Sequence, residues 1–299
     1  WIYDEDEAFP VNEEKISELI GQFQEFGVSF RIEEVEDFGQ YGLDEPVCTI
    51  RMETENKTYE ILLGDYSAMD SKRYVSIGDG NAYLVNEDPL ARFEVELGNL
   101  IRHDEIPGFE DVTQVQFSGT ESEKIVYEEN SANTYCAKDV YFMERGEEYL
   151  PLDTARVNDY LNTIKNINLK DYVTYDASEE ELKEYGMDSP ELSIRLDYTM
   201  TEEGNDEKIP GTVTLQIGRA PDEREKEAET ENTEENAAET ENAAEEVTAY
   251  ARIGESKIIY RITGQQFEKL MDMSYDTLRH QEMFWADFED MYRLDILLE

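Results

Sequence analysis

The sequence predicts an α+β protein, built as an internally duplicated unit of antiparallel β meander plus helices. Three observations predict this fold. A twelve-residue segment occurs twice with six identical positions, runs of alternating apolar and polar residues follow each copy, and helical spacing of apolar residues flanks these runs. Because strands and helices do not alternate one by one, a parallel βαβ sheet is disfavoured.

The repeat is clearest where residues 41–52 match residues 185–196 at an offset of 144. Both segments contain a Tyr-Gly turn followed by Asp and Pro, and an Arg-His pair later closes the last helix of each copy. The repeated residues are Tyr41, Gly42, Asp44, Pro46, Arg102 and His103 in the first copy, and Tyr185, Gly186, Asp188, Pro190, Arg279 and His280 in the second. We expect structural roles for them, because repetition in both copies favours a role in the shared scaffold.

The repeats define the expected domains. Residues 1–110 form repeat one, in which the start of the unit is missing, and residues 111–299 form repeat two. Repeat two is expected to contain opening strands over 111–150, a disordered acidic insert at about 221–247 and a closing strand over 291–298.

The spacing of apolar residues predicts the individual elements. The helices expected from an i, i+3, i+4 pattern cover residues 12–26, 89–101, 154–165 and 265–278. Asn12 and Asp153 are the expected N-caps of the first and the third of these helices. The strands expected from alternation cover residues 48–52, 59–63, 74–77, 82–85, 112–117, 124–127, 140–143 and 147–150, with a hairpin turn at 78–81.

The acidic insert holds 12 acidic and 2 basic residues over 221–246 and no aromatic residue. Such a segment cannot bury enough apolar surface to offset the entropy of ordering it, so we expect disorder. An insertion at a hairpin tip costs little closure entropy, and we interpret the insert as a tolerated one. An acidic interaction tail or a cation sponge is the alternative interpretation.

Charge and motifs exclude several functions. The chain has 26 Lys+Arg and 73 Asp+Glu, a net charge of −47, so it repels nucleic acid and anionic lipid headgroups. Its two histidines and two cysteines are scattered, which argues against a zinc site of four Cys and His ligands. The sequence contains no P-loop, nucleophile elbow, dinucleotide fingerprint or H-E-x-x-H motif. We therefore expect no catalytic residue, no metal site and no cofactor.

The Y-G-L/M-D-x-P turn, the meander with its glycine and the L/I-R-H-x-E helix end resemble the bacterial domain-of-unknown-function family DUF4340. The resemblance covers nearly the whole chain as two copies of the pattern. It implies an extracytoplasmic protein, since members typically carry an N-terminal membrane helix or lipoprotein signal and some accompany ABC-transporter gene clusters. No activity is established for the family, so the resemblance implies no catalytic residues, and it gives the two histidines no functional role.

The candidate site residues each have a structural interpretation beside a chemical one. His103 and His280 each precede a glutamate by two residues. They could form acid–base pairs with these glutamates, but a cationic group at a helix C-terminus is the favoured interpretation. Asp44 and Asp188 could be ligands, but acceptance of backbone N–H groups within a turn is favoured for both.

The two cysteines are expected to be free. Cys48 aligns with Leu192 on a strand face that carries apolar residues, so we expect a buried and inert thiol. Cys136 lies in a polar stretch over 128–139, so we expect the accessible thiol there. A disulfide would require their Cα atoms to come within about 7 Å of each other.

These observations predict a non-catalytic, extracytoplasmic, membrane-tethered interaction or accessory module. The expected partner is a protein, with ABC-transporter components as the candidate, and the membrane is reached only through an N-terminal anchor that this chain lacks. Because the chain begins with Trp1, we expect the natural chain to continue upstream through similar strands into that anchor. A carboxylate-dependent hydrolase acting on cell-wall polymers and a cation-dependent adhesin are the alternatives.

Overall fold

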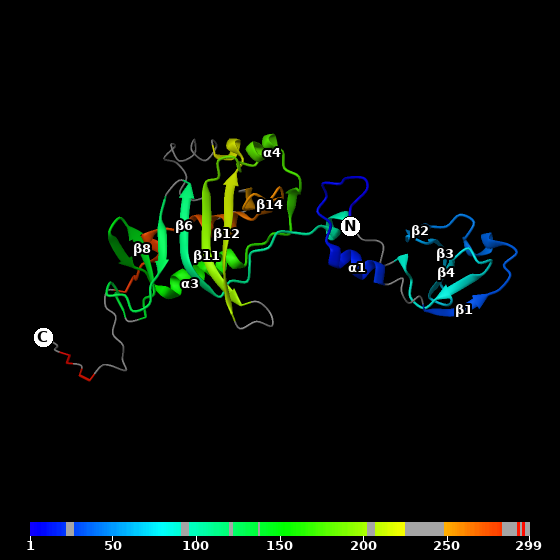
Figure 1. Ribbon diagram of the computed structural model, residues 1–299, viewed down its shortest axis with the longest axis horizontal. Coiled ribbons are helices and arrows are strands. Elements are labelled where there is room, and N and C mark those ends of the chain that lie inside the picture. Colours follow the sequence, from blue (N-terminus) through cyan, green and yellow to red (C-terminus); the bar gives the residue numbers. More distant parts are fainter. Residues whose placement is uncertain are drawn as a thin grey trace. The chain divides into compact units, whose positions relative to one another are not determined.

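The computed structural model describes residues 1–21, 27–90, 96–119, 122–136, 138–201, 207–224, 248–282, 292–293 and 295–296. Contacts divide the chain into two compact units, Trp1–Arg102 and His103–Glu299. The division falls a few residues before the boundary expected from the repeat. Each unit contains one sheet in which all pairs of neighbouring strands are antiparallel, so the α+β class is confirmed (Figure 1).

Unit 1 contains a five-stranded sheet in the order β1-β5-β4-β3-β2. Its elements are α1 (Glu13–Gly21), β1 (Val28–Ile32), the 3-10 helix η1 (Phe38–Tyr41), β2 (Cys48–Glu53), β3 (Thr58–Ser67), β4 (Lys72–Ser76), β5 (Ala82–Val85) and the 3-10 helix η2 (Leu97–Leu100). The inward side chains Ile61, Leu63, Val75 and Val85 form a small core, with Cys48, Ile50 and Met52 packed against it.

Unit 2 contains a nine-stranded sheet in the order β10-β14-β13-β12-β11-β6-β7-β8-β9. Its strands are β6 (Asp111–Gly119), β7 (Lys124–Tyr127), β8 (Tyr141–Arg145), β9 (Glu148–Pro151), β10 (Tyr172–Thr174), β11 (Leu192–Thr201), β12 (Lys208–Arg219), β13 (Ala249–Ile253) and β14 (Ile259–Ile262). Its helices are α3 (Thr154–Lys165), α4 (Glu179–Glu184), α7 (Gly264–Met271) and α8 (Tyr275–Leu278).

The duplication is visible in strand order and in side-chain contacts. The order β10-β14-β13-β12-β11 in unit 2 repeats the order β1-β5-β4-β3-β2 in unit 1, and β6 to β9 extend the sheet beyond β11. Tyr41 contacts Tyr74 with ring centroids 4.9 Å apart, and Tyr185 contacts Tyr250 at 4.8 Å. Each signature tyrosine therefore packs on the same strand of its own meander.

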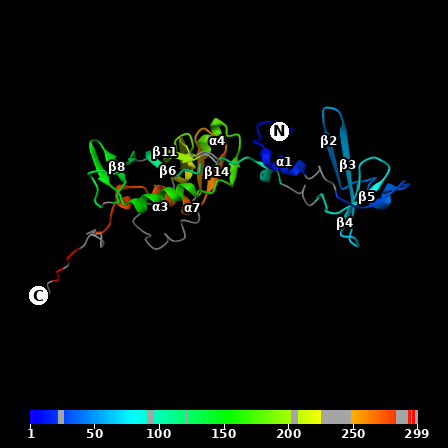
Figure 2. The same cartoon turned by 60° about the horizontal axis from the view of Figure 1, so that its bottom comes forward.

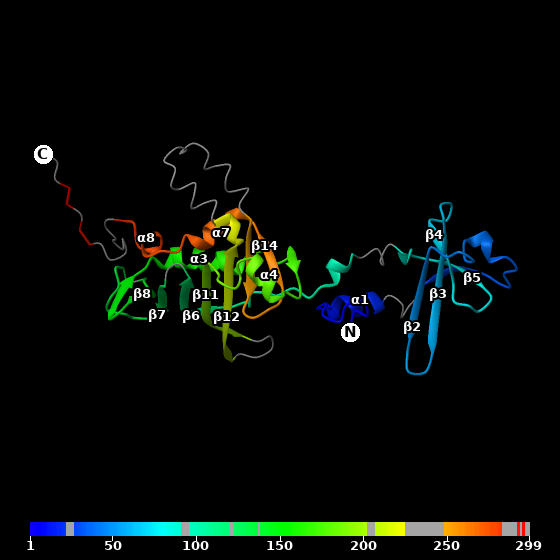
Figure 3. The same cartoon turned by 90° about the horizontal axis from the view of Figure 1, so that it is seen from above.

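Helix α3 covers one face of the sheet of unit 2, beside α7 (Figures 2 and 3). Asp153 caps it as expected, with its side chain accepting from Ala155 N at 2.9 Å. The apolar stripe of α3 is buried and consists of Val157, Tyr160, Leu161 and Ile164. The Tyr160 hydroxyl donates to the Leu270 carbonyl oxygen at 2.8 Å, which joins α3 to α7 inside the core.

Several expected helices differ from the observed ones. The first begins at Glu13, with Asn12 Oδ1 accepting from Lys15 N at 3.0 Å, and residues 22–26 lie outside the described residues. The described end of the expected helix 89–101 is the 3-10 helix η2, while residues 91–95 lie outside the description. The prediction of one continuous helix over 265–278 is wrong, because α7 ends at Met271 and Ser274 caps a new helix, α8.

The acidic insert is described only at its start, since residues 225–247 lie outside the described residues, as does most of the expected closing strand 291–298. Its first residues, 221–224, are helical. The Arg224 guanidinium donates to the carbonyl oxygens of Arg219, Ser189 and Gly186 at 2.9, 3.1 and 3.0 Å. The expectation of disorder is therefore wrong for this part of the insert, because Arg224 ties it to the turn at Gly186.

Replacing Arg224 tests whether its hydrogen bonds hold the start of the insert against the turn at Gly186. We expect Arg224→Ala to lower the free energy of unfolding of unit 2 by about 2 kcal/mol, the usual magnitude for hydrogen bonds from a charged donor. Urea denaturation monitored by circular dichroism measures the change. Arg195→Ala is the matched control, because its ion pair with Asp197 is half-exposed and is expected to contribute much less. Equal losses in the two variants would contradict the assignment.

A second prediction concerns the bidentate pair of Arg73 and Asp88 in unit 1. Arg73 Nε and Nη2 donate to the two Asp88 carboxylate oxygens at 2.6 and 2.8 Å, and Arg73 is only 8% exposed. The Arg73 guanidinium holds the pKa of Asp88 below its usual range. Asp88→Asn should lower the free energy of unfolding at neutral pH by about 3 kcal/mol, because a buried cation loses its counter-charge.

The pH dependence of this difference follows from the sign of the shift. A depressed carboxylate pKa stabilises the folded state above the unfolded pKa of about 4, and this contribution is lost as pH falls through the folded value. The gap between wild type and Asp88→Asn should therefore close on acidification below about pH 4. Glu53→Gln, which alters the exposed pair with Arg51, serves as control. A gap that is unchanged in acid would contradict the prediction.

Candidate functional site: a buried cysteine, aspartate and histidine

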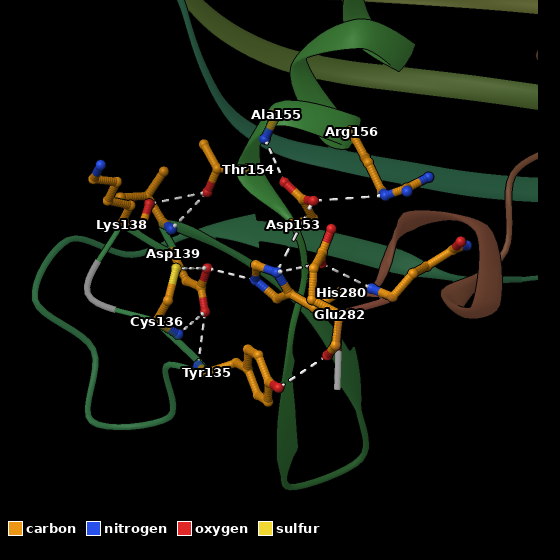
Figure 4. Close-up of polar contacts among 12 residues, drawn as sticks. Tyr135, Cys136, Lys138, Asp139, Asp153, Thr154, Ala155, Arg156, His280 and Glu282 are labelled. Atoms are coloured by element: carbon orange, nitrogen blue, oxygen red, sulfur yellow. Dashed lines mark hydrogen bonds and ion pairs between the residues drawn. The ribbon is translucent and has the colours of Figure 1, made fainter. Parts of the chain in front are cut away.

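Asp139 lies at the centre of a buried polar cluster in unit 2 (Figure 4). It is 2% exposed. Its Oδ2 accepts hydrogen bonds from the backbone N–H groups of Tyr135 and Cys136 at 2.7 and 2.8 Å. Its Oδ1 accepts from the Cys136 thiol at 3.1 Å and lies 2.8 Å from His280 Nε2. One carboxylate thus joins the loop between β7 and β8 to the segment after α8.

Thr154, the first residue of α3, fixes the loop that carries Cys136 and Asp139. Its hydroxyl donates to the Lys138 carbonyl oxygen at 3.1 Å and accepts from Val140 N at 3.2 Å. The Asp139 amide closes a turn onto the Cys136 carbonyl oxygen at 3.1 Å. Strand β8 begins directly after this loop, so the start of α3 and the start of β8 together hold the end of the turn that carries Asp139.

The His280 ring is held by an aromatic contact and faces carboxylates with both nitrogens. Tyr135 stacks on it with ring centroids 4.9 Å apart and planes tilted by 30°, and the Tyr135 hydroxyl donates to the Glu282 carbonyl oxygen at 3.0 Å. Nε2 faces Asp139, while Nδ1 lies 4.0 Å from Asp153 Oδ2 and 3.8 Å from Glu282 Oε2. The imidazole side chain is 7% exposed.

Burial and hydrogen bonding set the protonation states of the cluster. Burial raises the pKa of the Cys136 thiol, and its hydrogen bond to Asp139 raises that pKa further. For Asp139, burial opposes ionisation, but the hydrogen bonds from Cys136, His280 and Tyr135 outweigh it and hold the pKa below its usual range. At neutral pH the cluster therefore contains a carboxylate and a protonated thiol.

This arrangement differs from a cysteine nucleophile with its base. Nucleophilic catalysis needs the imidazole beside the thiol and an orienting group beyond the imidazole. Here the carboxylate lies between the thiol and the imidazole, and the thiol pKa is raised instead of lowered. The three side chains do, however, offer one sulfur, one oxygen and one nitrogen atom that all lie within 4.8 Å of one another, a donor set suited to a divalent metal ion.

The repeated residues are divided between the two units, and only His280 of this group enters the cluster. Gly42 and Gly186 have φ values of 63° and 69°, so both turns use the left-handed region that glycine permits. Asp44 Oδ1 accepts from Glu45 N at 3.0 Å, a contact within the turn. Arg279 Nε donates to Asp276 Oδ1 at 2.8 Å.

The two histidines have different surroundings, although they align in sequence. The His103 ring lies 6.1 and 5.9 Å from the rings of Tyr172 and Tyr260. The His280 ring lies between Tyr135 and three carboxylates. The structural equivalence of the repeats therefore does not extend to the histidines.

Cys136 and Asp139 were missed as a site by reasoning from sequence. The expectation that Cys136 is the accessible thiol is wrong, since Cys136 is 7% exposed and Cys48 is intermediate in exposure. Both cysteines are free, as expected. The one local signal is the three-residue spacing of Cys136 and Asp139, and the third member lies 141 residues beyond Asp139.

Fold and repeat together define a tandem α+β protein in which two related sheets follow one another along the chain. The family model "Domain of unknown function (DUF4340)" matches the chain twice, over residues 1–176 and 145–295. The chain belongs to this family, and the tandem arrangement expected from the sequence is confirmed. No curated protein and no solved structure matches the chain.

The order of thiol reactivity tests the protonation states described above. In metal-free protein we expect Cys48 to react with a disulfide reagent faster than Cys136, because Cys136 is buried, protonated and hydrogen-bonded to Asp139. Thiol titration of the native protein measures both rates, and Cys48→Ser and Cys136→Ser assign them. A fast reaction that persists in Cys48→Ser and disappears in Cys136→Ser would contradict the prediction.

Proposed function

We propose that this protein is a non-catalytic, extracytoplasmic interaction module, anchored to the cell membrane by a segment outside this chain and associated with an ABC-type transport system. Membership of the family supports the setting through the resemblance described above, and the surface of unit 1 supports the binding role. Among the described residues, no helix is both long and apolar enough to cross a membrane.

The observation that carries the binding role is an apolar hollow in unit 1. It has a volume of about 700 Å³ and is lined mainly by strand residues. Three of its lining side chains are large and apolar yet well exposed, namely Ile77 at 54%, Val28 at 46% and Tyr59 at 43%. A contiguous exposed apolar patch of this kind marks a site of protein contact.

The matching sheet of unit 2 offers a comparison. There α3 and α7 lie on the sheet, and the apolar stripe of α3 is buried. In unit 1, the counterpart helix α1 buries none of its described residues, although Ile20 borders the hollow. In the part of the chain that the structure describes, the same kind of sheet face is thus covered in unit 2 and uncovered in unit 1, which favours unit 1 as the binding part.

Charge favours a protein partner with basic residues around an apolar segment. The net charge of −47 repels nucleic acid and anionic lipid. Lys57 and Glu60 both border the hollow, so the charge argument rests on the chain as a whole. A partner segment with apolar side chains flanked by Lys or Arg complements the apolar hollow and the net charge.

The test uses the extracytoplasmic domains of the ABC-type permeases encoded in the genome that carries this gene. We expect these domains to bind the purified protein, and Ile77→Glu to weaken the affinity at least about tenfold, because a buried charge replaces an apolar contact. Calorimetry measures the affinity. The matched control is Tyr149→Glu, which alters an exposed apolar residue of unit 2 and should leave the affinity unchanged.

Two outcomes would overturn the proposal. One is an absence of binding, or binding that Ile77→Glu and Tyr149→Glu reduce equally. The other comes from a photo-reactive benzoylphenylalanine at position 77. If it cross-links in cells only to the α1 segment of its own chain, the hollow is covered internally and is no docking site. Cross-linking to one of these permeases would support the proposal.

A further inference from the structure

We propose that Cys136 Sγ, Asp139 Oδ1 and His280 Nε2 bind one Zn²⁺ ion. Asp139 Oδ1 already contacts the other two donor atoms, at 3.1 Å from the sulfur and 2.8 Å from the imidazole nitrogen. All three lie within 4.8 Å of one another. The metal would take the place of the hydrogen atoms that now bridge these atoms.

The donor set favours zinc over the hard cations. A thiolate and an imidazole are ligands of zinc, whereas calcium and magnesium take oxygen ligands. Zinc bonds of about 2.0 to 2.3 Å in a tetrahedron separate neighbouring ligand atoms by about 3.3 to 3.7 Å. Cys136 and His280 therefore need to move less than about 1 Å away from Asp139 to receive the ion.

Proton balance is simple at this site. Binding requires the thiolate, so the Cys136 proton is released to solvent. Neutral imidazole must present the lone pair of Nε2, so its proton resides on Nδ1. The carboxylates of Asp153 and Glu282 lie 4.0 and 3.8 Å from Nδ1 and favour a proton there. A zinc-bound histidine whose other nitrogen faces a carboxylate is a common arrangement.

Neighbouring groups already orient the three ligands (Figure 4). Two backbone N–H groups hold Asp139 Oδ2, which leaves Oδ1 for the metal. Tyr135 stacks on the imidazole and fixes its plane. Cys136 and Asp139 belong to one turn, which is anchored to α3 through Thr154. The three ligand side chains are thus already ordered before the metal ion binds, so the site is preorganised.

The cluster lies outside the five-stranded arrangement that the two units share. His103, which aligns with His280 in the sequence repeat, contacts tyrosine rings, and Cys48 lies on a strand beside the core of unit 1. The loop of Cys136 and Asp139 lies between β7 and β8, outside the five strands that the two units share. The acidic chain also raises the local concentration of cations.

The test is metal titration of the full chain after removal of metals with a chelator. We expect one high-affinity Zn²⁺ per chain in competition with a chromophoric chelator, and a thiolate-to-cobalt charge-transfer band when Co²⁺ is used as the probe. Cys136→Ser should abolish the band and weaken Zn²⁺ binding at least about 100-fold, while keeping a hydroxyl donor for Asp139. Cys48→Ser should change neither measurement.

Circular dichroism and a thermal melt of the metal-free variants separate ligand loss from misfolding. If Cys136→Ser does not fold, His280→Gln provides the second variant, since its amide retains a donor near Asp139. The proposal is overturned if cobalt gives no charge-transfer band in the wild-type protein. It is also overturned if Cys136→Ser binds Zn²⁺ as tightly as wild type, because the ion would then be held by surface carboxylates.

Discussion

The close approach of a glycine turn to a strand fixes the structure of each unit. A Cβ atom on Gly186 would lie 2.1 Å from the Arg219 carbonyl oxygen, and one on Gly64 would lie 2.2 Å from the Tyr41 carbonyl oxygen. No larger residue fits at these points. Because the turn lies directly against the second strand of its meander, the tyrosine before the turn reaches the third strand. The aromatic pair and the entry of the first strand both depend on this contact.

Alternation predicted the meander strands well, because one face of each strand is buried and the period of two is then visible in the sequence. Two short edge strands were missed because they lack such a buried face. Strand β1 is exposed along most of its length, and β10 has three residues of intermediate burial, so neither shows alternation. Helix α4 has six residues and depends on the capping box of Ser178 and Glu181. The break before α8 likewise depends on a cap that helical periodicity does not register.

The cluster around Asp139 could not be predicted, and the repeat itself concealed it. In the alignment of the two copies, His280 is equivalent to His103, which favours the same role for both residues. The loop that distinguishes them aligns with no part of the given sequence, so alignment gives it no signal. Its polar composition suggested exposure, but a buried carboxylate is tolerated when three donors and an imidazole nitrogen surround it. Those donors come together only through the tertiary fold.

The two family matches share residues 145–176, whereas the compact units divide at Arg102. Strand β6 pairs with β11 along eight residues, yet it precedes the second family match altogether. A fragment cut at the family boundary would therefore remove β6 and leave β11 as a long edge strand with unpaired backbone groups. Such an edge recruits strands from neighbouring molecules. The limits that define the family in sequence are thus not limits at which the chain can be divided into soluble parts.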